Sequence, residues 1–272
     1  MASFEKITSR DNQRLINARK VRDGRMTDLI FVEGIRLARE AIRSGIVVEE
    51  CFVSASFAGS DSRFELLEFI YKTSIFIAEL PDRIFQTIAD TENSQGVILI
   101  ARRPENLLAD VETSRSFANT LPVVLFLSEA SNPSNLGAIL RTAEAAGVKG
   151  VIVSQYSADV FSPKALRASM GAAFRVPIWS GVSFDEAIDW ARKNGMTTTA
   201  TTANSTNEHI KLNWKTPRLV VFGSEAHGLS DEEVDRVDET VRIVMKNEVE
   251  SLNLAVAAGI ILFEAKRQND IL

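Results

Sequence analysis

The chain has little of what metal centres, disulfide frameworks and membrane spans require. Its 272 residues include one cysteine, Cys51, and two histidines, His209 and His227. We therefore expect no internal disulfide and no Cys- and His-rich metal site. The longest uncharged apolar run, residues 251–263, has 13 residues, which is short of the ~20 that a membrane helix needs. Since the N-terminus is also polar and unlike a signal peptide, we expect a soluble, cytoplasmic protein without membrane association.

The familiar phosphate-binding and hydrolase motifs are also missing. The sequence contains no GxxxxGK[ST] loop and no GxGxxG loop, which disfavours an ordinary nucleotide-binding Rossmann enzyme. It contains no GxSxG nucleophile elbow either. His227 is a conceivable general base, but no acidic partner for it is identifiable. A turn or packing role is therefore the better interpretation of His227.

Positive charge is scarce overall but concentrated at one end. The formal net charge is −5, which on its own argues against a nucleic-acid partner. Residues 1–43, however, carry ten Lys and Arg against six Asp and Glu, whereas residues 44–104 and 105–272 have net charges of −4 and −5. On charge alone, a phosphate-binding surface and a solvated helix face explain the basic segment equally well. Its cationic residues up to position 25 are Lys6, Arg10, Arg14, Arg19, Lys20, Arg22 and Arg25.

Strand-like and helix-like segments alternate along the chain, which is the pattern of an α/β fold. In the first part, the expected strands are residues 29–33, 50–54, 74–80 and 96–101, and the expected helices are residues 35–44, 63–71 and 82–89. A polar stretch follows Pro104. It predicts a smaller N-terminal domain of residues 1–105, a linker of residues 106–120 and a second domain of residues 121–272.

The second domain begins with a continuous apolar run at residues 123–128, typical of a buried parallel strand. Further expected strands are residues 150–154, 174–178, 196–202, 219–223 and 240–244, and the expected helices are residues 136–146, 163–170, 184–193, 231–236 and 252–267. We predict an open sheet of parallel strands. Ligands of such sheets bind beyond the carboxyl ends of the strands, so the loops at those ends are where a site is expected.

Two polar loops have a simple structural interpretation, namely that each starts a helix. Residues 128–141 contain an Asn-Pro turn, after which Ser134 or Asn135 can cap a helix. Residues 244–257 lead into an apolar helix that Ser251 can cap.

A third polar loop, residues 220–230, contains two glycines. Gly223 and Gly228 bracket Glu225, and glycine allows backbone to approach a ligand closely. The simpler alternative is a strand, a turn and a helix capped by Ser230. Any one of the three loops alone is weak evidence for function.

Together, and in this order, the three loops resemble the motifs of the SpoU (TrmH-type) RNA 2′-O-ribose methyltransferases of the SPOUT superfamily. The N-terminal part also resembles the substrate-binding domain of that family, a ribosomal-protein-like RNA-binding α/β fold, in the segments ITSRDNQRLINARKVRDGR, FVEGIRLAREAI and NSQGVILIARRP. The segments that carry the resemblance of the second domain are NPSNLGAILRTAEAAGV, SPKALRASMGAAFRVPI, VVFGSEAHGLS and ESLNLAVAAGIILFE.

The resemblance implies a fold, a cofactor and partners. The second domain is expected to contain a deep trefoil knot that holds S-adenosylmethionine, and to form a homodimer. The implied catalytic positions are Asn135, Arg141, Glu225, Ser251 and Asn253, and the implied cofactor-binding positions are Gly223, Ile243, Met245 and Leu252. The expected RNA contacts are Arg10, Arg14, Arg19, Lys20, Arg22 and Arg25, with Lys164 and Arg167 from the second domain.

Methyl transfer from a sulfonium needs alignment of the ribose 2′-hydroxyl and loss of its proton, but no metal. The mechanism proposed for the family makes the residue at the Arg141 position the base that removes the 2′-hydroxyl proton. A guanidinium is a poor base, so the alternative is that Arg141 clamps an RNA phosphate. The sequence departs from the family at two cofactor-loop positions, with Val244 in place of proline and Asn247 in place of glycine. The expected function is methylation of structured RNA, rRNA rather than tRNA. The alternative is an RNA-binding protein that has lost catalysis.

Overall fold

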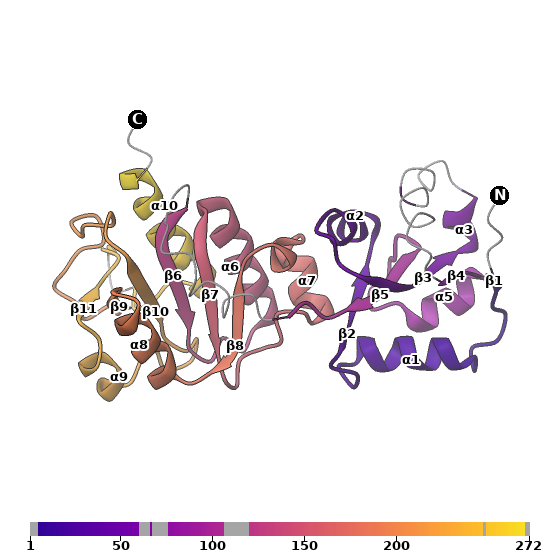
Figure 1. The fold of residues 1–272 in the computed structure, drawn as a ribbon, viewed down its shortest axis with the longest axis horizontal. Coiled ribbons are helices and arrows are strands. Elements are labelled where there is room, and N and C mark those ends of the chain that lie inside the picture. Colours follow the sequence, from indigo (N-terminus) through magenta and orange to yellow (C-terminus); the bar gives the residue numbers. More distant parts are fainter. Residues whose placement is uncertain (1–4, 60–65, 67–75, 106–119, 247–248, 270–272) are drawn as a thin grey trace. The chain divides into compact units, whose positions relative to one another are not determined.

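The computed structural model describes residues 5–59, 66, 76–105, 120–246 and 249–269. The chain divides into two compact units (Figure 1). The first unit comprises Met1–Glu105 and Phe161–Phe174, and the second comprises Asn106–Val160 and Arg175–Leu272. Each unit contains its own β-sheet. No helix in the described part of the chain is long and apolar enough to cross a membrane.

The first unit is built on a mixed sheet of five strands in the order β1-β4-β3-β5-β2. Strand β5 runs antiparallel to both of its neighbours, whereas β1, β4 and β3 run parallel to one another. The bounds of these strands are β1 Glu5–Lys6, β2 Leu29–Glu33, β3 Val48–Ser54, β4 Phe76–Leu80 and β5 Val97–Arg102.

Helices cover both faces of this sheet (Figure 1). On one face, α1 (Gln13–Arg22) and α5 (Asp82–Ile88) pack around a core that includes Leu15, Phe52 and Ile88. On the other face, α2 (Ile35–Arg43) packs against β2 and β5. Among the described residues, the unit also contains the short helices α3 (Ala55–Ala58) and α7 (Pro163–Ser169), of which α7 packs against β2. The predicted helix at 63–71 lies outside the described residues except for Leu66.

The second unit is an open sheet of six strands in the order β11-β9-β10-β6-β7-β8. All five strand pairs are parallel, which confirms the predicted sheet type. The bounds of these strands are β6 Leu121–Leu127, β7 Val148–Ser154, β8 Ile178–Val182, β9 Thr197–Thr201, β10 Arg218–Phe222 and β11 Glu239–Val241.

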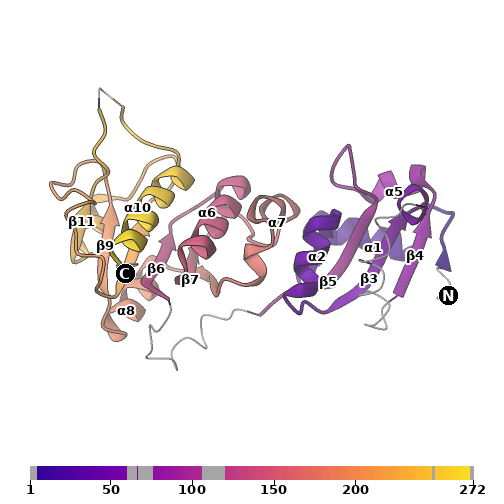
Figure 2. The ribbon, with the colours of Figure 1, turned by 90° about the horizontal axis from the view of Figure 1, so that it is seen from above.

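Helices also cover both faces of the second sheet (Figures 1 and 2). Helices α6 (Pro133–Ala146) and α10 (Leu254–Asn269) lie side by side over one face. Helix α8 (Phe184–Lys193) covers the other face, where it packs on Val124 and Phe126. Every residue of β6 is buried because both faces are covered. A short helix, α9 (Asp231–Asp235), follows β10.

One predicted strand, residues 174–178, is wrong. Ala172–Phe174 is a 3-10 turn, and β8 begins only at Ile178, which pairs with Val151 of β7. The alternating residues Phe174, Val176 and Ile178 are all buried, so the sequence has strand periodicity there without strand pairing. The other predicted elements in the described part are present, with ends within three residues of those predicted. The knot stays a prediction, because strand order and pairing do not record which loop the chain passes through.

Candidate active site at the carboxyl edge of the parallel sheet

The three polar loops lie at one edge of the second unit. They follow β6, β10 and β11, and because all the strands are parallel, their carboxyl ends point to the same edge. Three predicted site residues, one from each loop, are joined there by hydrogen bonds. Asn253 Nδ2 donates to Asn135 Oδ1 at 3.1 Å, and Asn135 Nδ2 donates to Glu225 Oε1.

The second carboxylate oxygen of Glu225 is also engaged. Its Oε2 accepts a hydrogen bond from the backbone N–H of Asn132 at 3.2 Å and one from Ser131 Oγ at 3.4 Å. Glu225 therefore has three donors: two in the loop after β6 and Asn135 in the first turn of α6. Sequence reasoning did not single out Ser131 or Asn132 for this role. Through these hydrogen bonds, the carboxylate of Glu225 connects the loop after β10 to the segment that follows β6.

The helix caps differ from those predicted. Asn132, not Ser134 or Asn135, caps α6: its side chain accepts from the Ser134 N–H, with Pro133 at the first helical turn. This frees Asn135 for the site.

At α10 the cap is Asn253, not Ser251. Asn253 Oδ1 accepts from the N–H groups of Ala255 and Val256 at 3.0 and 3.4 Å. A single side chain thus starts the helix with its oxygen and reaches Asn135 with its nitrogen. Ser230 does cap α9, in a capping box with Glu233.

Gly223 is needed for the shape of its own loop. Ser224 and Gly228 exchange two backbone hydrogen bonds of 3.0 Å, which close a tight turn. A Cβ atom on Gly223 would collide with the backbone of Gly228 and Leu229. His227 is exposed in this turn and donates its backbone N–H to Ser224 Oγ at 3.1 Å. The turn therefore presents Glu225 and gives His227 no acidic partner among the described residues.

Arg141 and Ser251 are not part of the hydrogen-bonded cluster. Both are exposed, and neither side chain has a partner among the described residues. Arg141 is six residues beyond Asn135 on α6, so the two side chains leave the helix about 120° apart. Arg141 is therefore available to a bound molecule rather than committed to the protein.

The predicted cofactor positions suit the uncharged, partly apolar part of a ligand. Ile243, Met245 and Leu252 are half-buried. The backbone N–H and C=O groups of residues 243–246 make no hydrogen bond within the described part of the chain. A backbone segment with free donors and acceptors and apolar side chains fits the adenosine of S-adenosylmethionine. Val244 is exposed, and Asn247 lies outside the described residues.

Four of the six RNA-binding cations predicted near the N-terminus already have protein partners. Arg10 pairs with Asp11 at 3.8 Å. Arg14 pairs with Glu50 and lies over the ring of Phe76. Arg19 donates to the carbonyl of Arg10 at 2.8 Å. Arg22 pairs with Asp23 and donates to three carbonyls at the end of α5. Exposed cations at this end of the chain include Arg10, Lys20 and Arg25, and in the described structure Lys20 and Arg25 have no side-chain partner.

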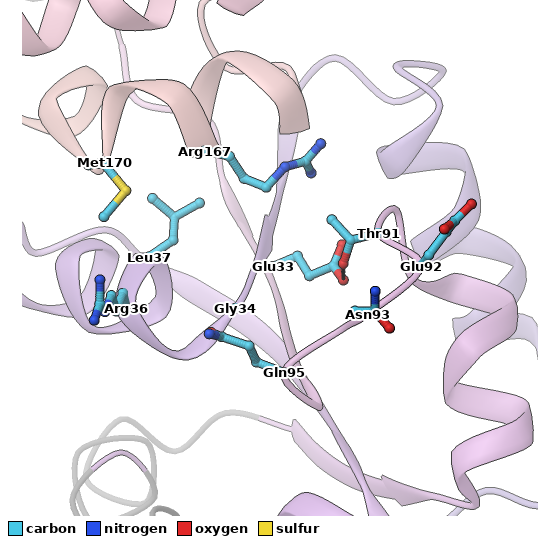
Figure 3. Close-up of a pocket in the computed structure, with 10 residues that line it drawn as sticks. All are labelled: Glu33, Gly34, Arg36, Leu37, Thr91, Glu92, Asn93, Gln95, Arg167 and Met170. Atoms are coloured by element: carbon cyan, nitrogen blue, oxygen red, sulfur yellow. Dashed lines mark hydrogen bonds between the residues drawn. The ribbon is translucent and has the colours of Figure 1, made fainter.

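Lys164 and Arg167 lie on α7, which belongs to the first unit. Lys164 is exposed, whereas Arg167 forms an ion pair of 2.6 Å with Asp90. Arg167 and Met170 also line a pocket of about 680 Å³ within this unit (Figure 3). Charges of both signs meet in it, so the pocket does not favour a phosphate. Its other lining residues are Glu33, Gly34, Arg36, Leu37, Thr91, Glu92, Asn93 and Gln95.

The fold and the site together define a two-domain α/β enzyme with its chemistry in strand-end loops. No cluster of three or more metal-ligating side chains exists within the described residues. The model of the SpoU rRNA Methylase family matches residues 122–263, just over half of the chain. The chain belongs to this family. Residues 4–99 match the MRM3-like substrate binding domain.

Relatives of known activity cover most of the chain. A 23S rRNA (uridine(2479)-2′-O)-methyltransferase from Streptomyces viridochromogenes is 30% identical over 243 residues, 88% of this chain and 82% of that protein. A 23S rRNA (guanosine(2553)-2′-O)-methyltransferase from Bacillus subtilis is 25% identical and covers 97% of this chain and 100% of that protein. Among solved structures, an AdoMet-bound rRNA methyltransferase from Sinorhizobium meliloti aligns with a TM-score of 0.85, 27% identity and 99% coverage of both chains.

Proposed function

We propose that this chain transfers the methyl group of S-adenosylmethionine to a ribose 2′-hydroxyl of ribosomal RNA. The observation that carries the proposal is the hydrogen-bonded series Asn253–Asn135–Glu225, which joins the three family motifs at the carboxyl edge of the sheet. The two rRNA 2′-O-methyltransferases described above support the choice of substrate. An rRNA substrate also supports a cytoplasmic location.

The cofactor supplies an activated methyl group on a sulfonium, so the protein has to align the acceptor and assist loss of its proton. Glu225 accepts three hydrogen bonds, which makes it a positioning residue rather than a base. Asn135 and Asn253 then hold fixed polar groups next to the acceptor. Alignment of this kind is worth several kcal/mol of the barrier, on the order of 7–11 in favourable cases.

Arg141 and Ser251 are proposed to act on the RNA. A guanidinium keeps its proton, and the exposed Arg141 offers a planar fork of donors to a phosphate. We assign Arg141 to clamping the phosphate beside the target ribose, with solvent as the final proton acceptor. Ser251 is exposed two residues before Asn253, at the end of the loop that leads into α10. We assign it to orienting the ribose.

The cofactor is assigned to the backbone near Gly223, Ile243, Met245 and Leu252. Free backbone groups at residues 243–246 support this assignment. Val244 is compatible with it, because its side chain points to solvent with 52% exposure. No observation supports the catalytically inactive alternative, since each of the polar positions of the three motifs is present.

A homodimer through the second unit is proposed from an apolar stripe on α10. Val256 and Phe263 are 51% and 50% exposed. They are seven residues apart, and Ile260 lies between them on the same face. A second copy of the chain would bury this stripe.

The proposal is tested by incubating the purified chain with labelled S-adenosylmethionine and either rRNA or tRNA. Digestion of the RNA to nucleosides followed by mass spectrometry identifies the product. We expect a 2′-O-methylnucleoside from rRNA. A methylated base, or label in tRNA alone, would contradict the proposal. Sedimentation of Phe263→Asp against the wild type tests the dimer.

A further inference from the structure

An exposed tyrosine stands at the same edge of the second sheet as the candidate active site. Tyr156 follows β7 and is 87% exposed, whereas the next most exposed large apolar side chain in the described structure, Val47, is 55% exposed. No ring contact or hydrogen bond of the Tyr156 side chain exists within the described residues. Its position requires an explanation, because a free aromatic ring in water contributes nothing to the fold.

The backbone of Tyr156 is in a strained conformation. Its φ is 65°, in the left-handed region that costs L residues energy and that glycine or asparagine occupies more readily. Two of the three described non-glycine residues with positive φ, Glu129 and Tyr156, lie in loops at this edge. Such strain persists only where the surrounding structure holds it, and it is found preferentially at functional sites.

Hydrogen bonds hold the turn that carries Tyr156 against residues 129–130 of the loop after β6. Ser157 Oγ accepts the Ala130 N–H at 3.1 Å, and the Ala158 N–H donates to the Ala130 carbonyl at 2.9 Å. Ser154, two residues before Tyr156, accepts the Glu129 N–H at 2.7 Å. Ser131, which follows Ala130 in the chain, donates a hydrogen bond to Glu225. The turn that carries the Tyr156 ring is therefore connected to the polar cluster through residues 130 and 131.

We propose that Tyr156 stacks on a nucleobase of the RNA next to the ribose that receives the methyl group. The proposal rests on the proposed RNA methyl transfer. In loops and bulges of structured RNA the bases are splayed out of the helical stack, and proteins hold such bases on aromatic rings. Tyr156 is a substrate-positioning residue, since stacking needs only the face of its ring and no proton transfer.

Three substitutions of Tyr156 test this role. Tyr156→Ala is expected to raise KM for rRNA about tenfold, corresponding to ~1.4 kcal/mol of lost stacking, with kcat and S-adenosylmethionine affinity unchanged. Tyr156→Phe keeps the ring and should retain the wild-type KM. Tyr156→Gly removes the ring and relieves the strain, so it should weaken RNA binding while the melting temperature stays equal or rises. Ile210→Ala, at another exposed apolar residue of the unit, should leave KM unchanged.

Other outcomes would overturn the inference. If the wild-type chain methylates RNA and both Tyr156→Ala and Tyr156→Gly keep the wild-type KM for rRNA, Tyr156 has no role in RNA binding. The proposed function would then stand and this inference would be wrong. A fall in melting temperature that parallels the loss of binding would make the ring structural. Loss of the dimer in sedimentation of Tyr156→Gly would place the ring in a subunit interface instead. If the wild-type chain transfers no methyl group to RNA, the proposed function is wrong, and this inference fails with it.

Discussion

Asn253 donates a hydrogen bond to Asn135 across a sequence separation of 118 residues. The same side chain caps α10 through its other atom. The start of the last helix, the first motif and, through Asn135, the Glu225 turn are thus fixed by one amide. This arrangement makes the geometry of the site dependent on a group that can be altered without loss of the helix cap.

Asn253→Asp separates these two roles. A carboxylate still accepts from the N–H groups of Ala255 and Val256, but it cannot donate to Asn135. We expect methyl transfer to fall at least tenfold with a small change in melting temperature. Asn253→Ala, which also loses the cap, should cost about 1 kcal/mol of stability in addition. A matched control is Ser230→Ala, which removes a cap away from the cluster. It should lower stability by a similar amount and leave kcat unchanged.

Two glycines of the second unit should respond oppositely to alanine. Gly223→Ala drives a Cβ into the Gly228–Leu229 backbone, so the turn opens and both stability and cofactor binding are lost. Gly259 lies inside α10, and Gly259→Ala places a Cβ 3.8 Å from Thr142 Cγ2 of α6, an ordinary contact between the two helices. It should stabilise the chain by about 0.5–1 kcal/mol. Denaturant titrations measure both effects, and a stable Gly223→Ala variant would show that the turn tolerates a side chain.

Cations at the C-terminal end of α1 that have no protein partner should contribute more to RNA binding than those that already have one. Lys20→Ala combined with Arg25→Ala removes two free cations, so RNA affinity should fall and the slope of log K against log salt should flatten by roughly one to two units. Arg22→Ala instead removes hydrogen bonds to the end of α5. It should destabilise the unit by about 1 kcal/mol with little change in slope. An unchanged slope in the double variant would mean that this basic end is only a solvated face.

Acid should weaken the end of α10. Hydrogen bonds from Arg267, then from Gln268, lower the pKa of Glu264 from 4.5 to about 2. A carboxyl with a depressed pKa stabilises the fold above its unfolded pKa, and this contribution disappears as the pH falls from about 4.5 to about 2. Glu264→Gln should therefore be less stable than the wild type at pH 7, by on the order of 1 kcal/mol after solvent screening. Urea titrations across this pH range should show the difference vanish near pH 2.

The sequence predicted elements best where local signals agreed. Helix α8 has the predicted bounds because Ser183 and Glu186 form a capping box at its start, next to an amphipathic run. The strand predicted at 174–178 failed because buried alternation can arise from an irregular approach to a strand. Strand pairing is a tertiary property, and a single segment does not encode it.

The site was located by motif order, but its internal contacts were not predictable. Nothing local in the sequence says that Asn135 bonds to Glu225, or that Asn253 rather than Ser251 caps α10. Arg14 and Arg22 look like free cations in the sequence, and only the fold supplies Glu50 and the α5 carbonyls as their partners. The Asn-Pro pair at 132–133 was a recoverable signal, since proline favours the first helical position after a capping residue.

The central claim is that this chain methylates a ribose 2′-hydroxyl of rRNA with Arg141 on the RNA side of the site. The most direct measurement maps 2′-O-methyl groups in total RNA from cells that lack the gene, complemented with the wild type or with Arg141→Ala. We predict one rRNA 2′-O-methyl group that is absent without the gene, restored by the wild type and not restored by Arg141→Ala, although that variant binds S-adenosylmethionine normally in calorimetry. An unchanged map without the gene, or full restoration by Arg141→Ala, would contradict the account.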